Sequence, residues 1–343
     1  MAKRNKKARA YLGVDVGGTK IQASLVDESG TVLGRQREPT PRDVSPRHVL
    51  DAIAQLIIKT AQQGDLELDD LSAIGLAIPG VVDPDSRRVI VTPNMNLTGL
   101  PVGERLEKRL GVPVALGNDC NLGALGEAWL GAGRKAQSLV AIFVGTGIGA
   151  GFVRRGKLWR GARESAGEIG HIVMQIGGPQ CGCGNSGCLE ALASRTAIER
   201  ELRQAMAAGR ETVLTEWLGN ELAVIRSNQL RRALELGDSL VADVMRRAAE
   251  VLGYACLTVR HLIDPELIVL GGGVIEACGD FLLPIVRAVV ASDRLRGARR
   301  GGEVVLSALG DDAVALGAVA LARKLAGRSP FKKKLRRGAS KRS

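Results

Sequence analysis

Runs of apolar residues, separated by polar and glycine-rich turns, divide the first third of the chain into short strands and one helix. The first three runs predict an antiparallel β-meander with tight turns. Its predicted strands are residues 11–16, 21–26 and 31–36. Apolar residues recur at helical spacing over residues 46–63, which predicts an amphipathic helix. A further apolar run at residues 74–78 predicts another buried strand.

The same plan recurs in the second half of the chain. A strand at 138–144, a polar turn and a return at 150–154 predict a second meander, completed by a third short strand. Two meanders of one design indicate an internal duplication with a cleft between the halves. Residues 195–260 are predicted to be mostly helical, a strand is expected at 267–270, and a last helix at 312–326.

Each meander carries a glycine-threonine turn at its first corner. The two turns are Gly17-Gly18-Thr19-Lys20 and Gly145-Thr146-Gly147. Glycine lets backbone N–H groups approach an anion and the threonine hydroxyl adds a donor, so the pair of turns predicts phosphate binding. Asp15, beside the first turn, is placed to hold Mg²⁺ directly or through water, because this ion prefers oxygen ligands. Lys20 could contact a phosphate or equally be solvated, and no Walker loop occurs.

Three cysteines and one histidine follow at close spacing. They are His171, Cys181, Cys183 and Cys188. Three thiols in so short a loop cannot all pair as disulfides, but with the imidazole they form a Cys3His set that is standard for tetrahedral zinc. The cluster could act only as a structural staple. Glu168 and Glu190 flank the ligands and are not needed by the zinc, which favours a metal-braced ligand pocket.

The length of 343 residues suggests two domains, and 45% hydrophobic residues with 44 glycines is ordinary for an α/β protein rich in loops. The formal charge of +12 arises from two terminal segments, with five Lys and Arg in residues 1–10 and ten in residues 323–343. The remainder has 33 Lys and Arg against 36 Asp and Glu. Aromatic residues, at 3%, are too few for base-stacking platforms. We therefore expect no specific nucleic-acid partner, only weak polyanion binding by the tails.

No apolar run is long enough to cross a bilayer, and the basic start leads into an alternating strand rather than an apolar signal segment. Three further cysteines, Cys120, Cys256 and Cys278, stand alone in apolar contexts, as reduced core thiols do. These features predict a cytoplasmic protein without a membrane partner.

Taken together, the motifs resemble those of the ROK (repressor, open reading frame, kinase) family, in family order over about residues 11–325. They are Asp15-x-Gly17-Gly18-Thr19-Lys20, Gly117-Asn118-Asp119, Val144-Gly-Thr-Gly-Ile-Gly-Ala-Gly151, Glu168-x-Gly-His171, Cys181-x-Cys-Gly-x-x-Gly-Cys-x-Glu190 and Leu270-Gly-Gly-Gly273. The resemblance implies an α/β protein with an actin/hexokinase-like duplicated ribonuclease-H-type fold and an interdomain cleft. The implied division is an N-terminal domain at 11–122 plus 312–327, a C-terminal domain with the zinc knot at 123–311, and disordered basic tails at 1–10 and 328–343.

Asp119 is the candidate catalytic base. It follows a predicted strand at 112–116, where α/β sheets present catalytic side chains, and its carboxylate could accept the proton of a sugar hydroxyl. The alternative is that Asn118 and Asp119 only cap the next helix, and the resemblance favours catalysis. His171 could bind zinc through one ring nitrogen and face a sugar hydroxyl with the other.

The resemblance also implies two larger groups of binding residues. The sugar would be held by Gly80, Asn94, Asn118, Asp119, Glu168, His171 and Glu190. The nucleotide would be held by Asp15, Gly17, Gly18, Thr19, Lys20, Gly145, Thr146, Gly147, Gly271, Gly272 and Gly273, the last three near adenine.

The reaction so implied is ATP-dependent phosphorylation of the 6-hydroxyl of a hexose, with glucose favoured, Mg²⁺ accompanying ATP and zinc in a structural role. Kinases of N-acetylmannosamine, N-acetylglucosamine, mannose or fructose share the constellation, and Asn96 and Leu100 depart from the commonest family pattern beside the sugar. Polyphosphate is an alternative donor, although members that use it typically lack the cysteine knot. A sugar-responsive repressor is the alternative from another class, but the ten residues before Tyr11 are too few for a helix-turn-helix domain. A homodimer is expected, because dimers are usual in the family.

Overall fold

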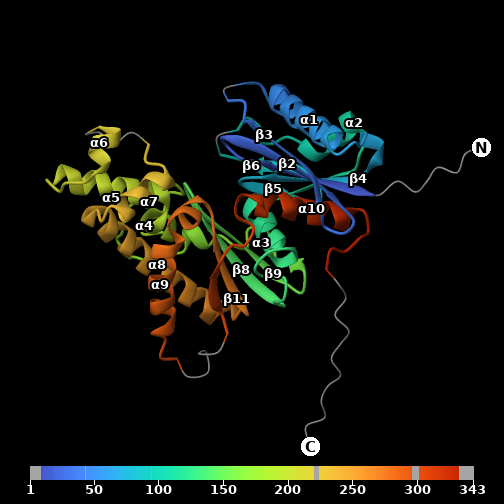
Figure 1. Cartoon of the computed structure of the whole chain (residues 1–343). Helices are drawn as coiled ribbons and strands as arrows, with labels where there is room; N and C mark the ends of the chain where they lie inside the picture. The colour runs from blue at the N-terminus through green and yellow to red at the C-terminus, as the bar shows by residue number, and fades with distance from the viewer. Residues whose placement is uncertain (1–8, 43, 94, 220–223, 296–300, 332–343) are drawn as a thin grey trace, which may run out of the picture.

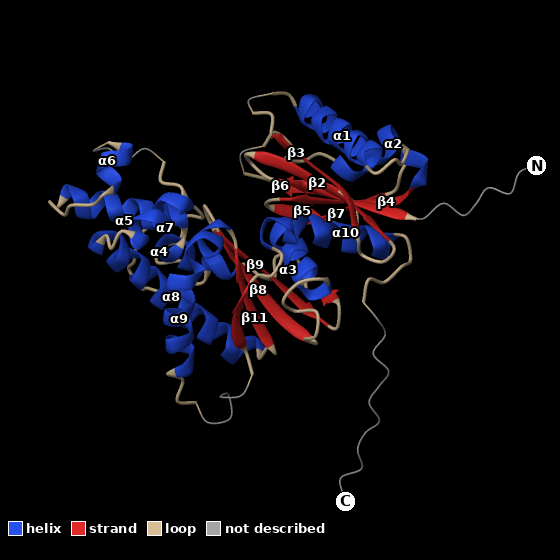
Figure 2. Cartoon of the chain, in the orientation of Figure 1, coloured by secondary structure: helices blue, strands red, loops and turns tan. Residues whose placement is uncertain are grey.

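The computed structural model describes residues 9–42, 44–93, 95–219, 224–295 and 301–331. Two five-stranded sheets form its framework (Figures 1 and 2), with strand orders β3-β2-β1-β4-β7 and β10-β9-β8-β11-β12. The strands of the first sheet are β1 (Ala10–Val16), β2 (Lys20–Asp27), β3 (Val32–Pro39), β4 (Leu71–Ile78) and β7 (Val114–Asn118). Those of the second are β8 (Ser138–Val144), β9 (Ile148–Arg154), β10 (Lys157–Leu158), β11 (Leu267–Gly271) and β12 (Glu303–Leu306).

The two sheets have the same design. In each, an antiparallel meander of three strands is followed by two strands that run parallel to the first strand of the meander. Both predicted meanders and the predicted strands at 74–78 and 267–270 are therefore confirmed. The structure adds a small hairpin, β5 (Val81–Asp83) with β6 (Arg88–Val91), which the apolar pattern did not predict.

Helices cover the faces of both sheets. They are α1 (Pro46–Gln63), α2 (Val102–Leu110), α3 (Asp119–Trp129), α4 (Leu189–Ala193), α5 (Arg195–Ala207), α6 (Leu214–Leu218), α7 (Ser227–Glu235), α8 (Ser239–Ile263), α9 (Gly273–Ala291) and α10 (Ala313–Leu325). Three short 3₁₀ turns complete the order: η1 (Leu68–Asp70), η2 (Ile169–His171) and η3 (Gly310–Asp312). Helix α1 has the predicted bounds, because its apolar stripe packs on the first sheet. No helix in the described part of the chain is long and apolar enough to cross a membrane.

Two helices join the sheets. Helix α10 packs on β1 and β4 of the first sheet, as the resemblance implied for the last helix, while α3 packs on β8 and β9 of the second. The two helices cross in close contact, since a Cβ at Gly317 would lie 1.7 Å from the carbonyl oxygen of Leu122. Only glycine permits this approach of two backbones. The domain boundary predicted after residue 122 lies within α3, so one continuous helix runs across it.

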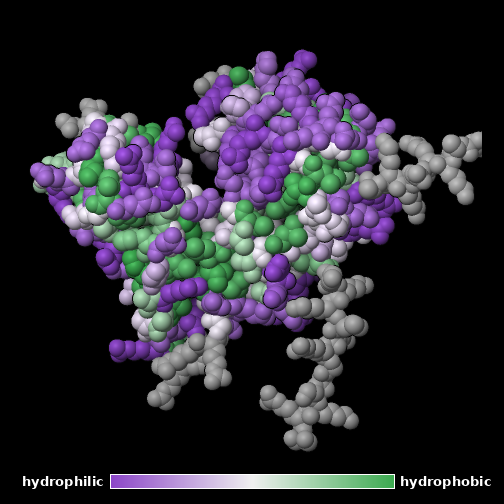
Figure 3. Space-filling model, in the orientation of Figure 1, coloured by the Kyte–Doolittle hydropathy of each residue, from purple (hydrophilic) through white to green (hydrophobic). Residues whose placement is uncertain are grey.

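The molecule has two lobes with a notch between them, open at the top of the space-filling view (Figure 3). One lobe contains the first sheet with α1 and α2, and the other contains the second sheet and the helices α4 to α9 (Figure 1). Each lobe has its own large apolar core. The crossing of α3 and α10 lies between the lobes (Figure 2) and supplies part of a third apolar cluster.

Candidate functional site

The first glycine-threonine turn begins where β1 ends. The backbone N–H of Gly17 donates to the carbonyl of Lys20 at 2.9 Å, and the hydroxyl of Thr40 donates to the carbonyl of Gly17. These bonds hold Gly18 and Thr19 at the exposed tip of the turn. Lys20 points its ammonium at Asp311, with 2.7 Å between Nζ and Oδ2.

Asp15 occupies the one position of β1 that is not fully buried, directly before this turn. Burial first, and next the neighbouring Asp119, raise the pKa of the Asp15 carboxyl to about 7. Lys20 and Arg37 act in the opposite direction. A cation placed beside Asp15 would reverse this shift, so the site has the electrostatics of a place for a positive ion.

The second turn follows β8 in the same way. The N–H of Gly145 donates to the carbonyl of Gly147 at 2.9 Å, and Thr146 lies exposed at the tip. Helix α5 supports this turn: the N–H of Arg195 donates to the carbonyl of Gly145, and the hydroxyl of Thr196 donates to the carbonyl of Thr146. The Arg195 guanidinium also donates to the hydroxyl oxygen of Thr146 at 2.8 Å.

Asp119 is the first residue of α3, at the end of β7. The cap of this helix is Asn118, whose side-chain oxygen accepts the N–H of Asn121 at 3.0 Å. Asp119 accepts from the side-chain amide of Asn118 at 2.9 Å and from the N–H of Cys120 at 2.8 Å. The same Asn118 amide donates to the carbonyl of Gly80, which anchors the β4–β5 turn beside Asp119. The capping role thus falls to Asn118 and leaves the Asp119 carboxylate for other work.

Burial raises the pKa of the Asp119 carboxyl above its ordinary value, while its hydrogen bonds oppose the rise. The electrostatic effect of Asp119 on Asp15 places the two carboxyl groups in one neighbourhood, at the ends of β7 and β1. They belong to one sheet, in which β4 separates the two strands.

The cysteine-histidine cluster is assembled as predicted. The ligand atoms of His171, Cys181, Cys183 and Cys188 all lie within 4.8 Å of one another. The Sγ atoms of Cys183 and Cys188 are 3.8 Å apart, and Nδ1 of His171 is 3.7 Å from Sγ of Cys181. Burial raises the pKa of the Cys188 thiol to about 12, so a thiolate there calls for a cation. The four residues could therefore hold a metal ion.

Two carboxylates connect this cluster to the rest of the site. Nε2 of His171 is 4.0 Å from a carboxylate oxygen of Glu168. Glu190, in the first turn of α4, accepts the S–H of Cys181 at 3.7 Å with one oxygen and the N–H of Ile148 at 2.9 Å with the other. A Cβ at Gly147 would lie 2.3 Å from Glu190, so this glycine is required for the contact. Glu190 thereby ties the cluster to the second glycine-threonine turn.

The remaining predicted residues surround these elements. Gly271 ends β11, Gly272 has a φ of 86° and caps α9, and Gly273 begins that helix. A Cβ at Gly272 would lie 2.7 Å from the backbone of Val144, at the edge of the second turn. Gly80 has a φ of 96°, and Asn94 lies outside the described residues.

Sequence reasoning missed Asp311 and Arg195. Asp311 accepts from both Lys20 and Arg37, and these ion pairs hold its pKa below the ordinary value. In the sequence, Asp311 is marked only by the neighbouring carboxylate of Asp312 near the start of the last helix. Because it is 291 residues from Lys20, no local pattern could indicate their contact. Arg195 is the first residue of the segment predicted to be mostly helical, and nothing in the local pattern indicates a contact with Thr146.

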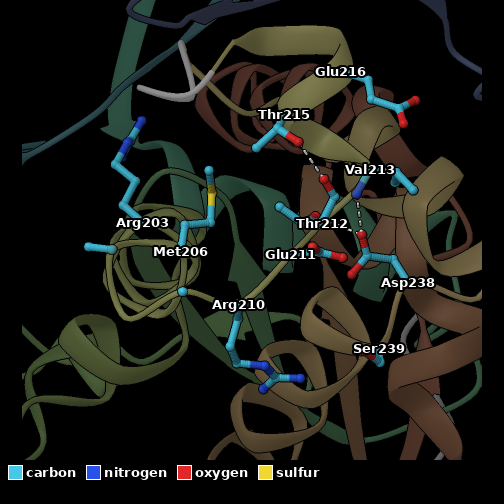
Figure 4. Close-up of a pocket in the computed structure, with 12 residues that line it drawn as sticks. Arg203, Met206, Arg210, Glu211, Thr212, Val213, Thr215, Glu216, Asp238 and Ser239 are labelled. Atoms are coloured by element: carbon cyan, nitrogen blue, oxygen red, sulfur yellow. Dashed lines mark hydrogen bonds between the residues drawn. The ribbon is translucent and has the colours of Figure 1, made fainter.

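A groove on the helical lobe lies apart from these motifs (Figure 4). Residues of α5, of α6, of the segment between these helices and of the start of α8 line it; they include Arg203, Arg210 and Asp238, the residue that caps α8. Asp238 is buried and already satisfied, since it accepts from the Thr212 hydroxyl, the Val213 N–H and the Val241 N–H. Among the described residues that line the groove, the buried carboxylate is thus fully paired.

Comparison with known proteins agrees with this arrangement. The chain is 34% identical to the glucokinase of Halalkalibacterium halodurans over 310 residues, which is 90% of this chain and 93% of that protein. It is 31% identical to the N-acetylglucosamine repressor of Escherichia coli O157:H7 over 316 residues, 91% of this chain but 75% of the repressor. The solved structure of a ROK family glucokinase from Streptomyces griseus, in complex with glucose and AMPPNP, has 33% sequence identity to it and a TM-score of 0.79. That match covers 92% of this chain and 99% of the other.

These similarities confirm the predicted hexokinase-like α/β fold. Residues 11–325 match the ROK family as a whole, from the first strand to the end of the last helix. With that match and relatives above 30% identity over nine-tenths of its length, the chain belongs to the ROK family.

Proposed function

We propose that this protein is an ATP-dependent hexose kinase that transfers the γ-phosphoryl group of ATP to the 6-hydroxyl of glucose. The observation that carries the proposal is the placement of Asp119. Its carboxylate is held by Asn118 and the N-terminus of α3, in the same neighbourhood as Asp15 at the first glycine-threonine turn. A base next to a phosphate site is the minimum that phosphoryl transfer to an alcohol requires.

Asp119 would act on the sugar hydroxyl. A carboxylate that accepts two hydrogen bonds on one oxygen, Oδ1, keeps the other oxygen for the hydroxyl proton. The hydroxyl proton of the sugar becomes more acidic as its oxygen begins to attack phosphorus, and Asp119 would accept it. Because burial raises the pKa of Asp119, this carboxylate is a better base than an exposed aspartate. The helix N-terminus at α3 stabilises the ionised form before reaction.

The two turns would hold the phosphates. Exposed Thr19 and Thr146 carry hydroxyl donors at their tips, and their glycines leave the backbone open to an anion. Mg²⁺ bound with ATP would supply charge neutralisation on the β- and γ-phosphates. Asp15 fits this ion, because a cation beside it would stabilise a carboxylate whose pKa is raised by burial and by the nearby Asp119.

The cysteine-histidine cluster fits zinc. Two sulfurs about 2.3 Å from a tetrahedral zinc ion lie about 3.8 Å apart, which is the distance between Cys183 and Cys188. Four protein ligands fill a tetrahedral shell, so the ion would serve structure and supply rigidity to the loop. His171 would then keep a fixed tautomer, with Nε2 and Glu168 available to sugar hydroxyls.

The test is a coupled ADP-release assay with Mg-ATP and a panel of sugars: glucose, mannose, fructose, N-acetylglucosamine and N-acetylmannosamine. We expect kcat/KM for glucose to exceed that for every other sugar. Preference for an acetamido sugar would retain the reaction and change the substrate. Absence of turnover on the whole panel by folded, zinc-loaded protein would refute the kinase proposal with ATP; the same panel with polyphosphate then tests the other donor. The homodimer and the cytoplasmic location stay predictions from the sequence.

A further inference from the structure

The guanidinium of Arg195 lies against the second glycine-threonine turn. Within the described part of the chain, its side chain donates three hydrogen bonds: to the Thr146 hydroxyl at 2.8 Å, to a carboxylate oxygen of Glu199 at 2.8 Å and to the carbonyl of Ile225 at 3.0 Å. A guanidinium has five N–H donors, so part of its donor capacity is left. The side chain is 20% exposed, which keeps that part accessible to a ligand.

The contact with Arg195 determines how the Thr146 hydroxyl can be used. Arginine only donates, whereas a hydroxyl can accept two bonds and donate one. Because the Thr146 oxygen accepts from Arg195, its own proton remains to be donated to another acceptor. At an exposed turn tip whose backbone is also held by Arg195 and Thr196, that acceptor would be an anion outside the protein.

Arg195 shares its carboxylate partner with a second arginine. Glu199 is 8% exposed and accepts from Arg195 at 2.8 Å and from Arg203 at 3.4 Å. Arg203 lines the groove in Figure 4, whereas Arg195 contacts Thr146 of the second turn.

We propose that Arg195 is a positioning residue for the nucleotide phosphates: it orients the Thr146 hydroxyl as a donor and places a cation behind the second turn. The proposal deepens the kinase function above and rests on it. Arginine is suited to this work because its planar fork holds Thr146 and Glu199 at fixed angles, which a lysine cannot do.

The experiment compares five variants in steady-state kinetics and in calorimetric titration with Mg-ADP: Arg195→Gln, Arg195→Lys, Arg203→Gln, Thr146→Val, and the double variant of Thr146→Val with Arg195→Gln. Arg195→Gln should raise KM for ATP and Kd for Mg-ADP about tenfold, the typical effect of one lost charge-assisted hydrogen bond, with KM for glucose changed less than about twofold. Arg195→Lys should recover part of the loss. Arg203→Gln is the matched control, because it removes the other guanidinium on Glu199 and should leave both constants unchanged. A Thr146→Val and Arg195→Gln double variant should lose less than the product of the two single effects.

The outcomes separate this proposal from the function on which it rests. Unchanged nucleotide affinity in Arg195→Gln, or an equal loss in Arg203→Gln, would overturn the role of Arg195. A parallel rise of KM for glucose would do so as well, since it indicates a general structural defect. If the wild type binds Mg-ADP but phosphorylates no sugar, the kinase function fails and the binding data still decide on Arg195. If the wild type binds no nucleotide, both fail. Should Arg195→Gln not fold, Arg195→Lys supplies the same comparison.

Discussion

The two glycine-threonine turns have the same place in duplicated sheets, yet different parts of the chain support them. The first turn is bonded to Thr40, directly after β3, and, through Lys20, to Asp311 in η3, which precedes α10. The second is bonded to α5 and, through Glu190, to the cysteine-histidine cluster. The second half of the chain therefore repeats the glycine-threonine turn but not its support.

This difference assigns different tasks to the two lobes. The first turn lies beside Asp15 and the junction between the lobes, so its geometry depends on how α10 sits on the first sheet. Glu190 contacts both the strand that follows the second turn and the cluster that contains His171. Loss of a metal from the cluster should therefore disturb both the second turn and the residues proposed to bind sugar. Four predictions test this contrast.

The largest effect is expected at Asp119, the proposed catalytic base. Asp119→Asn should lower kcat about a thousandfold or more, because the substitution removes the base and its charge. The melting temperature should change little, since Asn118 and not Asp119 caps α3. Steady-state kinetics and thermal unfolding measure the two effects. Turnover within about tenfold of the wild type would exclude Asp119 as the base.

The pH dependence should follow the same residue. Asp119 must be ionised to accept a proton, and burial raises its pKa, so activity is lost as pH falls through a value above the 3.8 of an exposed aspartate. Below that value kcat, measured at saturating Mg-ATP so that the cation keeps Asp15 ionised, should fall about tenfold per pH unit. Thermal unfolding measured over the same range distinguishes titration from acid denaturation. A profile that stays flat down to pH 4 would contradict the assignment.

Metal loss should affect the second turn and leave the first one intact. Cys183→Ser should release zinc and raise KM for glucose about tenfold, the usual range for a perturbed metal shell. Cys278→Ser is the control, because this buried thiol contacts the carbonyl of Ser227 and lies outside the cluster. Elemental analysis and kinetics give the readout. Full zinc occupancy in Cys183→Ser would remove Cys183 from the ligand set.

The smallest effect is expected at Lys20. Because its ammonium is paired with the exposed Asp311, Lys20→Met should raise KM for ATP only about threefold, in the range of a surface ion pair. Lys59→Met, which breaks the exposed pair with Glu38, provides the background value. A loss above about thirtyfold for Lys20→Met would mean that Lys20 leaves Asp311 and binds a phosphate, which would make the two turns more alike than their supports indicate.

Much of this architecture could be predicted from local pattern. Both meanders, the bounds of α1 and the last helix follow from apolar periodicity, because each is a local consequence of burying one face. The cysteine-histidine cluster follows from spacing, since three of its four ligands lie within eight residues of one another. Even Asp119 could be located, because strand ends in α/β sheets are where catalytic side chains gather.

The supports of the two turns could not be predicted in this way. The partners Lys20 and Asp311 are 291 residues apart, and Arg195 and Thr146 are 49 apart. No periodicity, motif or characteristic spacing in the sequence links the two residues of either pair. A side-chain hydrogen bond between distant residues depends on where the folded elements that carry them lie. The sequence alone thus predicted the repeated elements, the candidate metal ligands and the candidate base, for which local pattern or spacing suffices. Which residues hold each turn was decided only by the tertiary structure, in which α10 packs on the first sheet and α5 packs on α4 and α8.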